Sequence, residues 1–256
     1  MSQTDNWEHH WEEYERAAAK NPAQAFRRQL IMRLLAAGNV PRRILDIGSG
    51  TGDLLAALRD EYPEAELRGI ELSRAGIESA GRKVPDAVVL QRDLTLSEPP
   101  PSEYVGWATH AVCSEVLEHV DDPRHLLEVS RAFLAPRCRL VVTVPGGPIT
   151  AYDRHIGHRR HFRSDDLADL LRGAGFELIR ATGAGFPVFN LYRLLMWVLG
   201  ARLVDVAGAG EPSGPARAAM SAFALLLRLG SRWSPRGWQI VAVAHVPDSP
   251  GPGVRG

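Results

Sequence analysis

Hydrophobic positions along the chain follow two different periods. Short apolar runs typical of buried strands occur at residues 43–47, 67–71, 87–90, 108–113, 139–144, 176–181 and 238–246. Between most of them, apolar residues recur at helical spacing, which predicts helices at residues 54–61, 73–82, 123–134 and 164–172. Strands that alternate with helices indicate a parallel sheet covered by helices, so the predicted fold class is α/β.

Two segments lie outside this alternation. Residues 1–40 predict two helices, and the first carries an aromatic stripe that includes Trp11 and Tyr14. Residues 186–236 hold two apolar helices before the last strand. We therefore divide the chain into N-terminal helices (1–40), a core (41–185), a helical insertion (186–236), a final core strand (237–246) and an irregular tail (247–256).

The composition is that of a globular enzyme with no general affinity for nucleic acid. Thirty basic and 30 acidic residues give a net charge of zero, and 45% of the residues are hydrophobic. This balance fits neither a disordered chain nor a nucleic-acid-binding protein. No uncharged apolar stretch approaches the roughly 20 residues of a transmembrane segment. The N-terminus lacks a signal-peptide pattern and Cys113 and Cys138 lack metal-ligand spacing, which favours reduced thiols and a cytoplasmic location.

A glycine turn follows the first apolar strand. Residues 45–52 read Leu-Asp-Ile-Gly-Ser-Gly-Thr-Gly, so Gly48, Gly50 and Gly52 lie between a strand and a helix, where backbone can approach a ligand closely. An acid follows at the position of the third glycine of a dinucleotide fingerprint, which argues against NAD. The carboxylate of Asp46 favours a ligand that carries positive charge.

Two further acids follow the next two strands. Glu71 ends the strand at 67–71, where a carboxylate can accept hydrogen bonds from both hydroxyls of a ribose, and Leu72 follows as an apolar wall. Asp93 lies just past the third strand, placed to accept a hydrogen bond from the amino group of adenine, while Leu94 packs on the ring. Three acids at successive strand ends therefore indicate one nucleoside.

These motifs, together with Ser-Glu-Val-Leu-Glu-His-Val at residues 114–120, resemble the class I S-adenosylmethionine-dependent methyltransferases. The resemblance covers residues 7–180. It implies a seven-stranded, doubly wound, Rossmann-like sheet whose last strand runs antiparallel between the fifth and sixth strands. It also implies S-adenosylmethionine as cofactor, S-adenosylhomocysteine as product, and a cofactor site made of Asp46, Gly48, Ser49, Gly50, Gly52, Glu71, Leu72, Asp93, Leu94, Ser114, Glu115 and His119.

The N-terminal aromatic stripe has two interpretations. It is either the packed face of a first helix or a lid that closes over the cofactor and excludes water from the transfer site. On the second interpretation, Trp11 and Tyr14 belong to the cofactor site.

The acceptor side is predicted in the segment after the fifth strand, because loops at the carboxyl ends of parallel strands bind ligands. Residues 152–163 hold three histidines and four arginines. An activated methyl donor needs mainly a well-positioned nucleophile, and an oxygen nucleophile gains further from a general base. We take His158 and His155 as candidate bases and His119, at the boundary between cofactor and acceptor, as a third. The alternative interpretation is a solvated basic loop.

The remaining acceptor contacts are predicted from charge and apolar surface. An arginine of the 152–163 segment can hold a phosphate or carboxylate, and the inserted helices can form a roof over an apolar acceptor. Core packing, a dimer face and contact with a membrane surface are the alternatives for these helices. We expect no metal, because no Cys or further Asp completes a familiar ligand set beyond Asp153. The predicted contacts are Tyr152, Arg154, Arg159, Phe186, Phe189 and Tyr192.

The sequence thus predicts an S-adenosylmethionine-dependent methyltransferase acting on an oxygen of a small, partly apolar acceptor that can be anionic. The alternatives are N- or C-methylation of a natural product or lipid-like substrate, and a non-catalytic S-adenosylmethionine-binding regulatory module. We expect a monomer or homodimer with no nucleic-acid partner.

Overall fold

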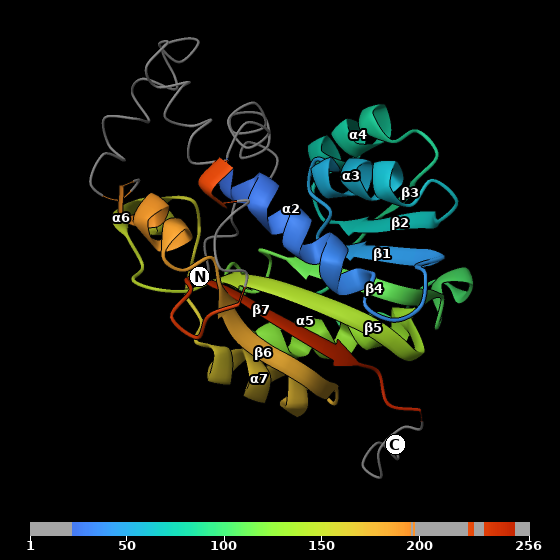
Figure 1. Cartoon of the computed structure of the whole chain (residues 1–256). Helices are drawn as coiled ribbons and strands as arrows, with labels where there is room; N and C mark the ends of the chain where they lie inside the picture. The colour runs from blue at the N-terminus through green and yellow to red at the C-terminus, as the bar shows by residue number, and fades with distance from the viewer. Residues whose placement is uncertain (1–21, 196, 198–224, 228–232, 249–256) are drawn as a thin grey trace.

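A seven-stranded sheet forms the centre of the computed structural model (Figure 1). The structure describes residues 22–195, 197, 225–227 and 233–248. Its elements, in chain order, are α2 (Pro22–Leu35), β1 (Arg43–Ile47), α3 (Asp53–Glu61), β2 (Glu66–Glu71), α4 (Arg74–Lys83), β3 (Val88–Gln91), η1 (Ser102–Tyr104), β4 (Ala108–Ser114), α5 (Pro123–Ser130), η2 (Arg131–Phe133), β5 (Leu134–Pro145), α6 (Ala151–His155), α7 (Ser164–Gly173), β6 (Glu177–Ala184) and β7 (Gln239–His245).

The strand order is β3-β2-β1-β4-β5-β7-β6. Strand β1 pairs in parallel with both β2 and β4, whereas β7 runs antiparallel between β5 and β6 (Figure 1). The predicted α/β class and the antiparallel last strand are therefore confirmed. The order of the strands reverses between β1 and β4, and open α/β sheets bind ligands at such a switch point.

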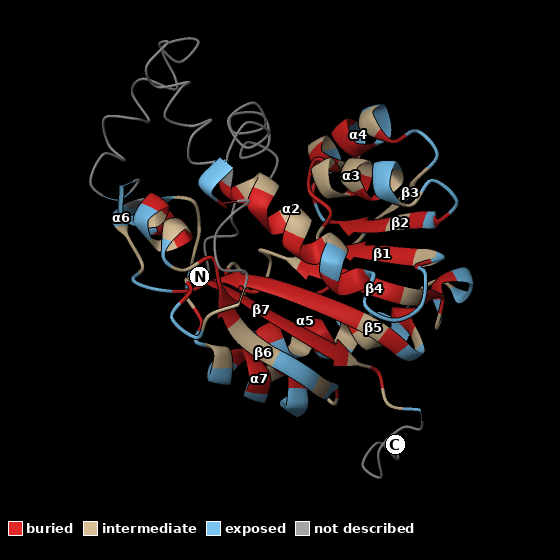
Figure 2. Cartoon of the chain, in the orientation of Figure 1, coloured by how far each residue is buried: buried red, intermediate tan, exposed pale blue. Residues whose placement is uncertain are grey.

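Helices cover both faces of the sheet. Helices α2, α3 and α4 lie on one face, and α5 and α7 lie on the other (Figure 1). Successive residues of β5 serve the two sides: Val141 packs in the core below α2, and Leu140 and Val142 pack in the core with α5 and α7. Most of β1, β4, β5 and β7 is buried (Figure 2), which explains why these strands appear as continuous apolar runs in the sequence.

The boundary between α5 and β5 differs from the sequence prediction. The helix predicted at 123–134 ends at Ser130, whose hydroxyl donates to the carbonyl of Leu126, and β5 begins at Leu134 instead of residue 139. Leu134 pairs with Ala108 of β4, so this start depends on a partner strand distant in the sequence. The apolar pattern missed it because Pro136 and Arg137 interrupt the run.

Two further boundaries were wrong. Strand β6 continues beyond the predicted residue 181 to Ala184, because its pairing with β7 persists as far as Gln239. The segment 146–163, predicted to be irregular, contains the short helix α6. The start of α6 is held by Asp153, whose carboxylate accepts hydrogen bonds from the amide and hydroxyl of Thr150, each 2.8 Å long.

The described part of the inserted segment packs on the N-terminal helix. Residues 188–195 and 225–227 are helical. Phe189 and Tyr192 are buried in the core below α2, and the Phe189 ring lies 5.5 Å from that of Phe26. Within the described ranges, no helix combines the length and apolarity needed to cross a membrane. The division of the chain stays a prediction, and residues 1–21, with Trp11 and Tyr14, lie outside the described residues.

The end of the glycine turn gives a stability test. Gly52 has φ +79°, and a Cβ there would lie 2.7 Å from Cα and Cβ of Ala80 in α4. We expect Gly52→Ala to lower the free energy of unfolding by about 1–3 kcal/mol or more, through backbone strain and this clash. Gly81→Ala is the matched control, since a Cβ at this exposed position in α4 meets nothing within 4 Å. Equal stability of both variants in denaturant unfolding would contradict the account.

Candidate active site

The glycine turn is folded back against β2. The amides of Gly48 and Ser49 both donate to the carbonyl of Ile70, at 2.8 and 3.0 Å. Gly48, Gly50 and Gly52 have φ values of +74°, +51° and +79°, which side chains disfavour. A Cβ on Gly48 would lie 2.5 Å from Cγ2 of Val116, in the turn after β4. The turns after β1 and β4 therefore approach each other as closely as glycine allows.

Two carboxylates flank the glycine turn. Glu71, at the end of β2, accepts hydrogen bonds from the amide of Gly50 at 2.8 Å and from the amide of Ser73 at 2.9 Å. Asp46 is buried at 2% exposure, and its Oδ2 has no hydrogen-bond partner among the described residues. Burial, and then the charge of Glu71, raise the pKa of Asp46 to about 7. A cationic group bound next to Asp46 would favour its ionised carboxylate, which burial and the charge of Glu71 disfavour.

The other residues predicted from the second and third strands have mixed positions. Leu72 is 45% exposed, as an apolar wall open to a ligand requires. Leu94 is buried in the core with α5 and α7. Asp93 bends back on its own loop, where Oδ1 accepts from the amide of Thr95 at 2.8 Å and from its hydroxyl. The contacts of Asp93 and Leu94 with adenine stay predictions.

Glu115 is the centre of a partly buried polar network just after β4. It has φ +57°, and its carboxylate contacts Arg27 of α2 at 3.0 Å, Gln239 of β7 at 3.0 Å and the hydroxyl of Thr143 of β5 at 3.1 Å. Arg27 also donates to Gln239. Ser114 is hydrogen bonded to Thr143. In this structure Glu115 thus joins α2 to the sheet, and direct contact of Ser114 and Glu115 with a cofactor stays a prediction.

The loop after β5 docks on the turn after β4. The amide of Arg159 donates to the carbonyl of Glu118 at 2.8 Å, and that of Phe162 donates to the carbonyl of Pro145 at 2.9 Å. This docking stacks the His158 ring edge-on against His119, with ring centroids 4.8 Å apart. Two of the three histidines predicted as bases therefore lie together, although about 40 residues separate them.

The hydrogen bonds of His158 fix its tautomer. His161 Nδ1 lies 3.1 Å from the carbonyl of Gly147, and His161 Nε2 lies 3.2 Å from His158 Nδ1. Because the carbonyl only accepts, the proton of His161 is on Nδ1, and His158 donates from its own Nδ1. The lone pair of His158 is consequently on Nε2. Burial, only partly offset by the carboxylate of Asp153, lowers the pKa of His158 to about 4, so the ring is neutral near pH 7.

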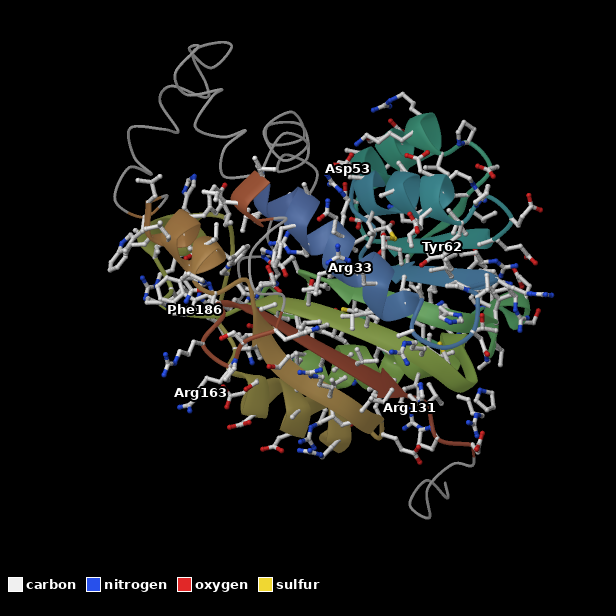
Figure 3. All side chains as sticks on the ribbon, viewed as in Figure 1. Arg33, Asp53, Tyr62, Arg131, Arg163 and Phe186 are labelled. Carbon is white, nitrogen blue, oxygen red and sulfur yellow. The ribbon has the colours of Figure 1, made fainter. Side chains whose placement is uncertain are left out.

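The other residues predicted to contact the acceptor do not all lie next to His119 and His158. His155 and Arg154 are exposed, and Arg159 is paired with Asp121. Phe186 is half-buried just beyond β6 (Figure 3), while the buried Phe189 and Tyr192 match the core-packing alternative. The side chain of Tyr152 lies outside the described part of the chain. Contacts of these residues with an acceptor stay predictions.

The sequence prediction missed several residues that organise the site. Arg27 and Gln239 hold Glu115, Asp153 accepts from Arg193 at 3.3 Å, and His161 sets the tautomer of His158. The available signal for Gln239 was a polar residue at the start of an apolar run, whereas Arg27 is one of three arginines in α2 and nothing in the sequence distinguishes it. Nothing in a single sequence pairs Arg193 with Asp153, which lie 40 residues apart.

Comparison with known proteins identifies the family. A model described as "Methyltransferase domain" matches residues 11–181 of the chain. The chain belongs to the methyltransferase domain family. The match covers the glycine turn, both flanking carboxylates, the His119 turn and the loop with His158. The roles predicted for these residues stay predictions.

Individual relatives agree with this assignment. An O-methyltransferase of Penicillium expansum (cnsE) is 33% identical over 150 residues, covering 54% of this chain and 53% of the relative. A trans-aconitate 2-methyltransferase of Yersinia pestis is 30% identical over 105 residues, covering 41% of this chain and 39% of the relative. The chain therefore spans about half the length, or less, of these curated relatives.

A solved structure shares the fold of this methyltransferase. The geranyl diphosphate C-methyltransferase from Streptomyces coelicolor A3(2), solved with Mg2+, geranyl diphosphate and S-adenosylhomocysteine, superposes with a TM-score of 0.58. It is 14% identical, and the match covers 87% of this chain and 78% of that one. This likeness supports the fold.

The raised pKa of Asp46 predicts a pH-dependent stability of the ligand-free protein. The folded protein keeps this proton up to about pH 7, whereas the usual carboxyl value is 3.8. The stability that this protonated carboxyl contributes is fully present below the pKa of the unfolded chain, 3.8, and is lost as the pH rises to the pKa of the folded protein, about 7. Between about pH 5 and about pH 8 the loss is about 3 kcal/mol, at about 1.4 kcal/mol per pKa unit.

Asp46→Asn removes this titration. We expect the free energy of unfolding of the variant, measured in urea at the two pH values, to fall by about 3 kcal/mol less than that of the wild-type protein. Other titrating groups contribute equally to both proteins and cancel in the difference. The same pH dependence in both would contradict the burial of a protonated Asp46.

Proposed function

We propose that this methyltransferase uses S-adenosylmethionine to methylate an oxygen of a small, partly apolar acceptor. The observation that carries the cofactor assignment is the buried Asp46, with an unpartnered Oδ2 beside three glycines of positive φ. The relative from Penicillium expansum is an O-methyltransferase, which supports oxygen as the nucleophile.

The residues present fit this cofactor. Asp46 would accept from its ammonium group, since an unpaired buried carboxylate is most stable next to a cation. The oxygens of Glu71 accept hydrogen bonds from the amides of Gly50 and Ser73, and a carboxylate oxygen can accept more than one hydrogen bond, including those from the hydroxyls of a ribose. The glycine turn has no side chains that would separate the backbone from the ligand. S-adenosylmethionine would supply the methyl group, whose carbon bonds to the acceptor oxygen as the carbon–sulfur bond breaks and sulfur keeps the electron pair.

The acceptor would lie beside His119 and His158. The proton that the acceptor oxygen loses needs a neutral group nearby, and His158 carries a lone pair on Nε2 and is neutral near pH 7. Its partner His161 holds the ring by a 3.2 Å hydrogen bond, so the lone pair keeps a fixed direction. The protein's contribution is chiefly to hold the nucleophile in line with the methyl group.

An anionic acceptor is compatible with the surrounding charge. Arg154 and Arg163 are exposed on either side of the histidines in the same loop (Figure 3 labels Arg163). The Yersinia relative is named for trans-aconitate, an anionic acceptor. We include carboxylates and hydroxy acids in the proposed acceptor class.

Cofactor binding is tested by titration calorimetry with S-adenosylmethionine. We expect binding by the wild-type protein and at least about tenfold weaker binding by Asp46→Ala and Glu71→Ala, because each loses a charge-assisted hydrogen bond. Asp53→Asn is the matched control: it removes an acid at the start of α3 (Figure 3) that pairs with Lys83 at 2.9 Å and should leave affinity unchanged. Absence of binding by the wild-type protein would refute the function.

The role of His158 is tested by turnover. With an acceptor found by screening hydroxyl and carboxylate compounds for S-adenosylhomocysteine formation, His158→Ala should lower kcat by about 10²- to 10⁴-fold with unchanged cofactor affinity. His125→Ala, which changes a histidine bonded to Ser97, is the control. Unchanged kcat in His158→Ala would reject His158 as the base. If kcat fell in His155→Ala instead, His155 would be the base.

A further inference from the structure

Five side chains that can bind metal gather where the loop after β5 meets the turn after β4. They form two overlapping groups that share His158. Within each group, the three atoms that can act as ligands lie within 4.8 Å of one another. The groups are Glu118, His119 and His158, and Asp153, His158 and His161.

The Asp153 group is complete without an ion. Asp153 Oδ2 accepts from the amide and hydroxyl of Thr150 at 2.8 Å and from Arg193 at 3.3 Å. Burial alone would raise the pKa of Asp153, but Arg193 and the bonds from Thr150 hold it below its usual range. The guanidinium already supplies the positive charge that this carboxylate needs, and it would repel a cation placed beside it.

The carboxyl group of Glu118, in contrast, lacks hydrogen-bond donors of this kind among the described residues. It is 0% exposed, and neither carboxyl oxygen has a hydrogen-bond partner among the described residues. Nε2 of His119 lies 4.0 Å from Oε1. Burial and then the charge of Glu115 raise the pKa of Glu118 well above its usual range, and the more distant charges of Arg27 and Arg193 offset this only in part. A fully buried carboxyl group with no partner is costly, and native proteins keep one chiefly where a ligand completes it.

The hydrogen bonds of the loop prepare His158 as a ligand. Gly147 fixes His161, and His161 in turn fixes His158 with its lone pair on Nε2. Metal-binding histidines are ordinarily held in this way, by a hydrogen bond from the ring nitrogen that does not bind the ion. The lone pair that a metal ion would need is thus on the ring nitrogen that does not take part in this series.

We propose that Glu118, His119 and His158 form a binding site for a divalent transition-metal cation. Two imidazoles and one carboxylate are a ligand set that zinc and ferrous iron use in sites that keep open positions. Ligand atoms bound at about 2.1 Å lie about 3.4 Å apart, so closing on an ion requires the side chains to move by about 1 Å. Imidazole ligands favour such an ion over Mg2+ or Ca2+.

The open positions give the cation a role in the proposed reaction. An acceptor hydroxyl or carboxylate bound there would be placed beside the cofactor, and a bound hydroxyl would lose its proton more readily. This role rests on the proposed methyltransferase function, whereas binding of the cation does not. It would replace the general-base role of His158, because the Nε2 lone pair would be bound to the cation. The sequence analysis predicts no metal because no Cys or further Asp completes a familiar ligand set beyond Asp153; two of the three ligands proposed here come from the turn after β4, which is distant in the sequence.

The experiment is a titration of the metal-free protein with Co2+, followed by visible absorption and by competition with Zn2+. The full chain is first treated with a chelator. We expect one site per chain in the wild-type protein, displaced by Zn2+, and loss of that site in Glu118→Gln and His158→Ala. His161→Ala should weaken binding by about 10- to 100-fold, because it removes the hydrogen bond that orients a ligand.

Two controls exclude other histidines. The double variant His9→Gln/His10→Gln removes the adjacent histidines near the N-terminus, and His125→Ala removes a surface histidine. Both should bind Co2+ as the wild-type protein does. Wild-type binding in Glu118→Gln and His158→Ala, loss of binding in the double variant, or no stoichiometric binding at all would overturn the proposal.

Titration with S-adenosylmethionine separates this proposal from the proposed function. Glu118→Gln and His158→Ala should keep the cofactor affinity of the wild-type protein, which shows that they are folded. Binding of Co2+ without binding of S-adenosylmethionine would support the metal site and refute the methyltransferase function. The reverse result would refute the metal site alone.

Discussion

The partly buried ion pair between Arg27 and Glu115 determines how the two halves of the site meet. Glu115 holds φ +57° at the end of β4, a conformation that costs about 1–3 kcal/mol and persists only where surrounding contacts fix it. Arg27, Gln239 and Thr143 provide those contacts from α2, β7 and β5. These contacts fix the direction in which the chain continues after Glu115. Val116 then lies against Gly48 of the glycine turn, and Glu118 and His119 lie next to the loop after β5.

This arrangement separates a cofactor half that depends on backbone from an acceptor half that depends on side chains. At the glycine turn, close approach of Gly48 to Val116 and of Gly52 to Ala80 fixes the path of the main chain. At the acceptor half, a hydrogen-bonded series from Gly147 through His161 to His158 fixes a ring. The first half is suited to a ligand that many proteins share, whereas the second can vary by substitution of single side chains without a change of fold.

The sequence was sufficient for the parts of the structure that local pattern determines. The strands β1, β4 and β7 are continuous apolar runs because both of their faces are buried, and the glycine turn with Asp46 and Glu71 is recognisable because each residue lies at a strand end. The start of β5 at Leu134 was missed because it depends on pairing with Ala108. The roles of Arg27, Gln239 and Arg193 were missed for the same reason: each is defined by a partner at least 40 residues away.

Three carboxylates at the ends of β1 and β4 show how charge organises the site. Glu118, Asp46 and Glu115 together raise the pKa of the buried Cys113 beyond the effect of its own burial, so all three act on the same point of β4. Of the three, Glu115 forms an ion pair with a guanidinium, that of Arg27 at 3.0 Å, whereas burial is the largest cause that raises the pKa of Asp46 and of Glu118. Burial thus favours the neutral form of Asp46 and of Glu118, and a cation next to either would oppose this shift. Asp46 and Glu118 are therefore the two positions at which we propose that a ligand brings positive charge: an ammonium group beside the glycine turn, and a metal ion beside the histidines.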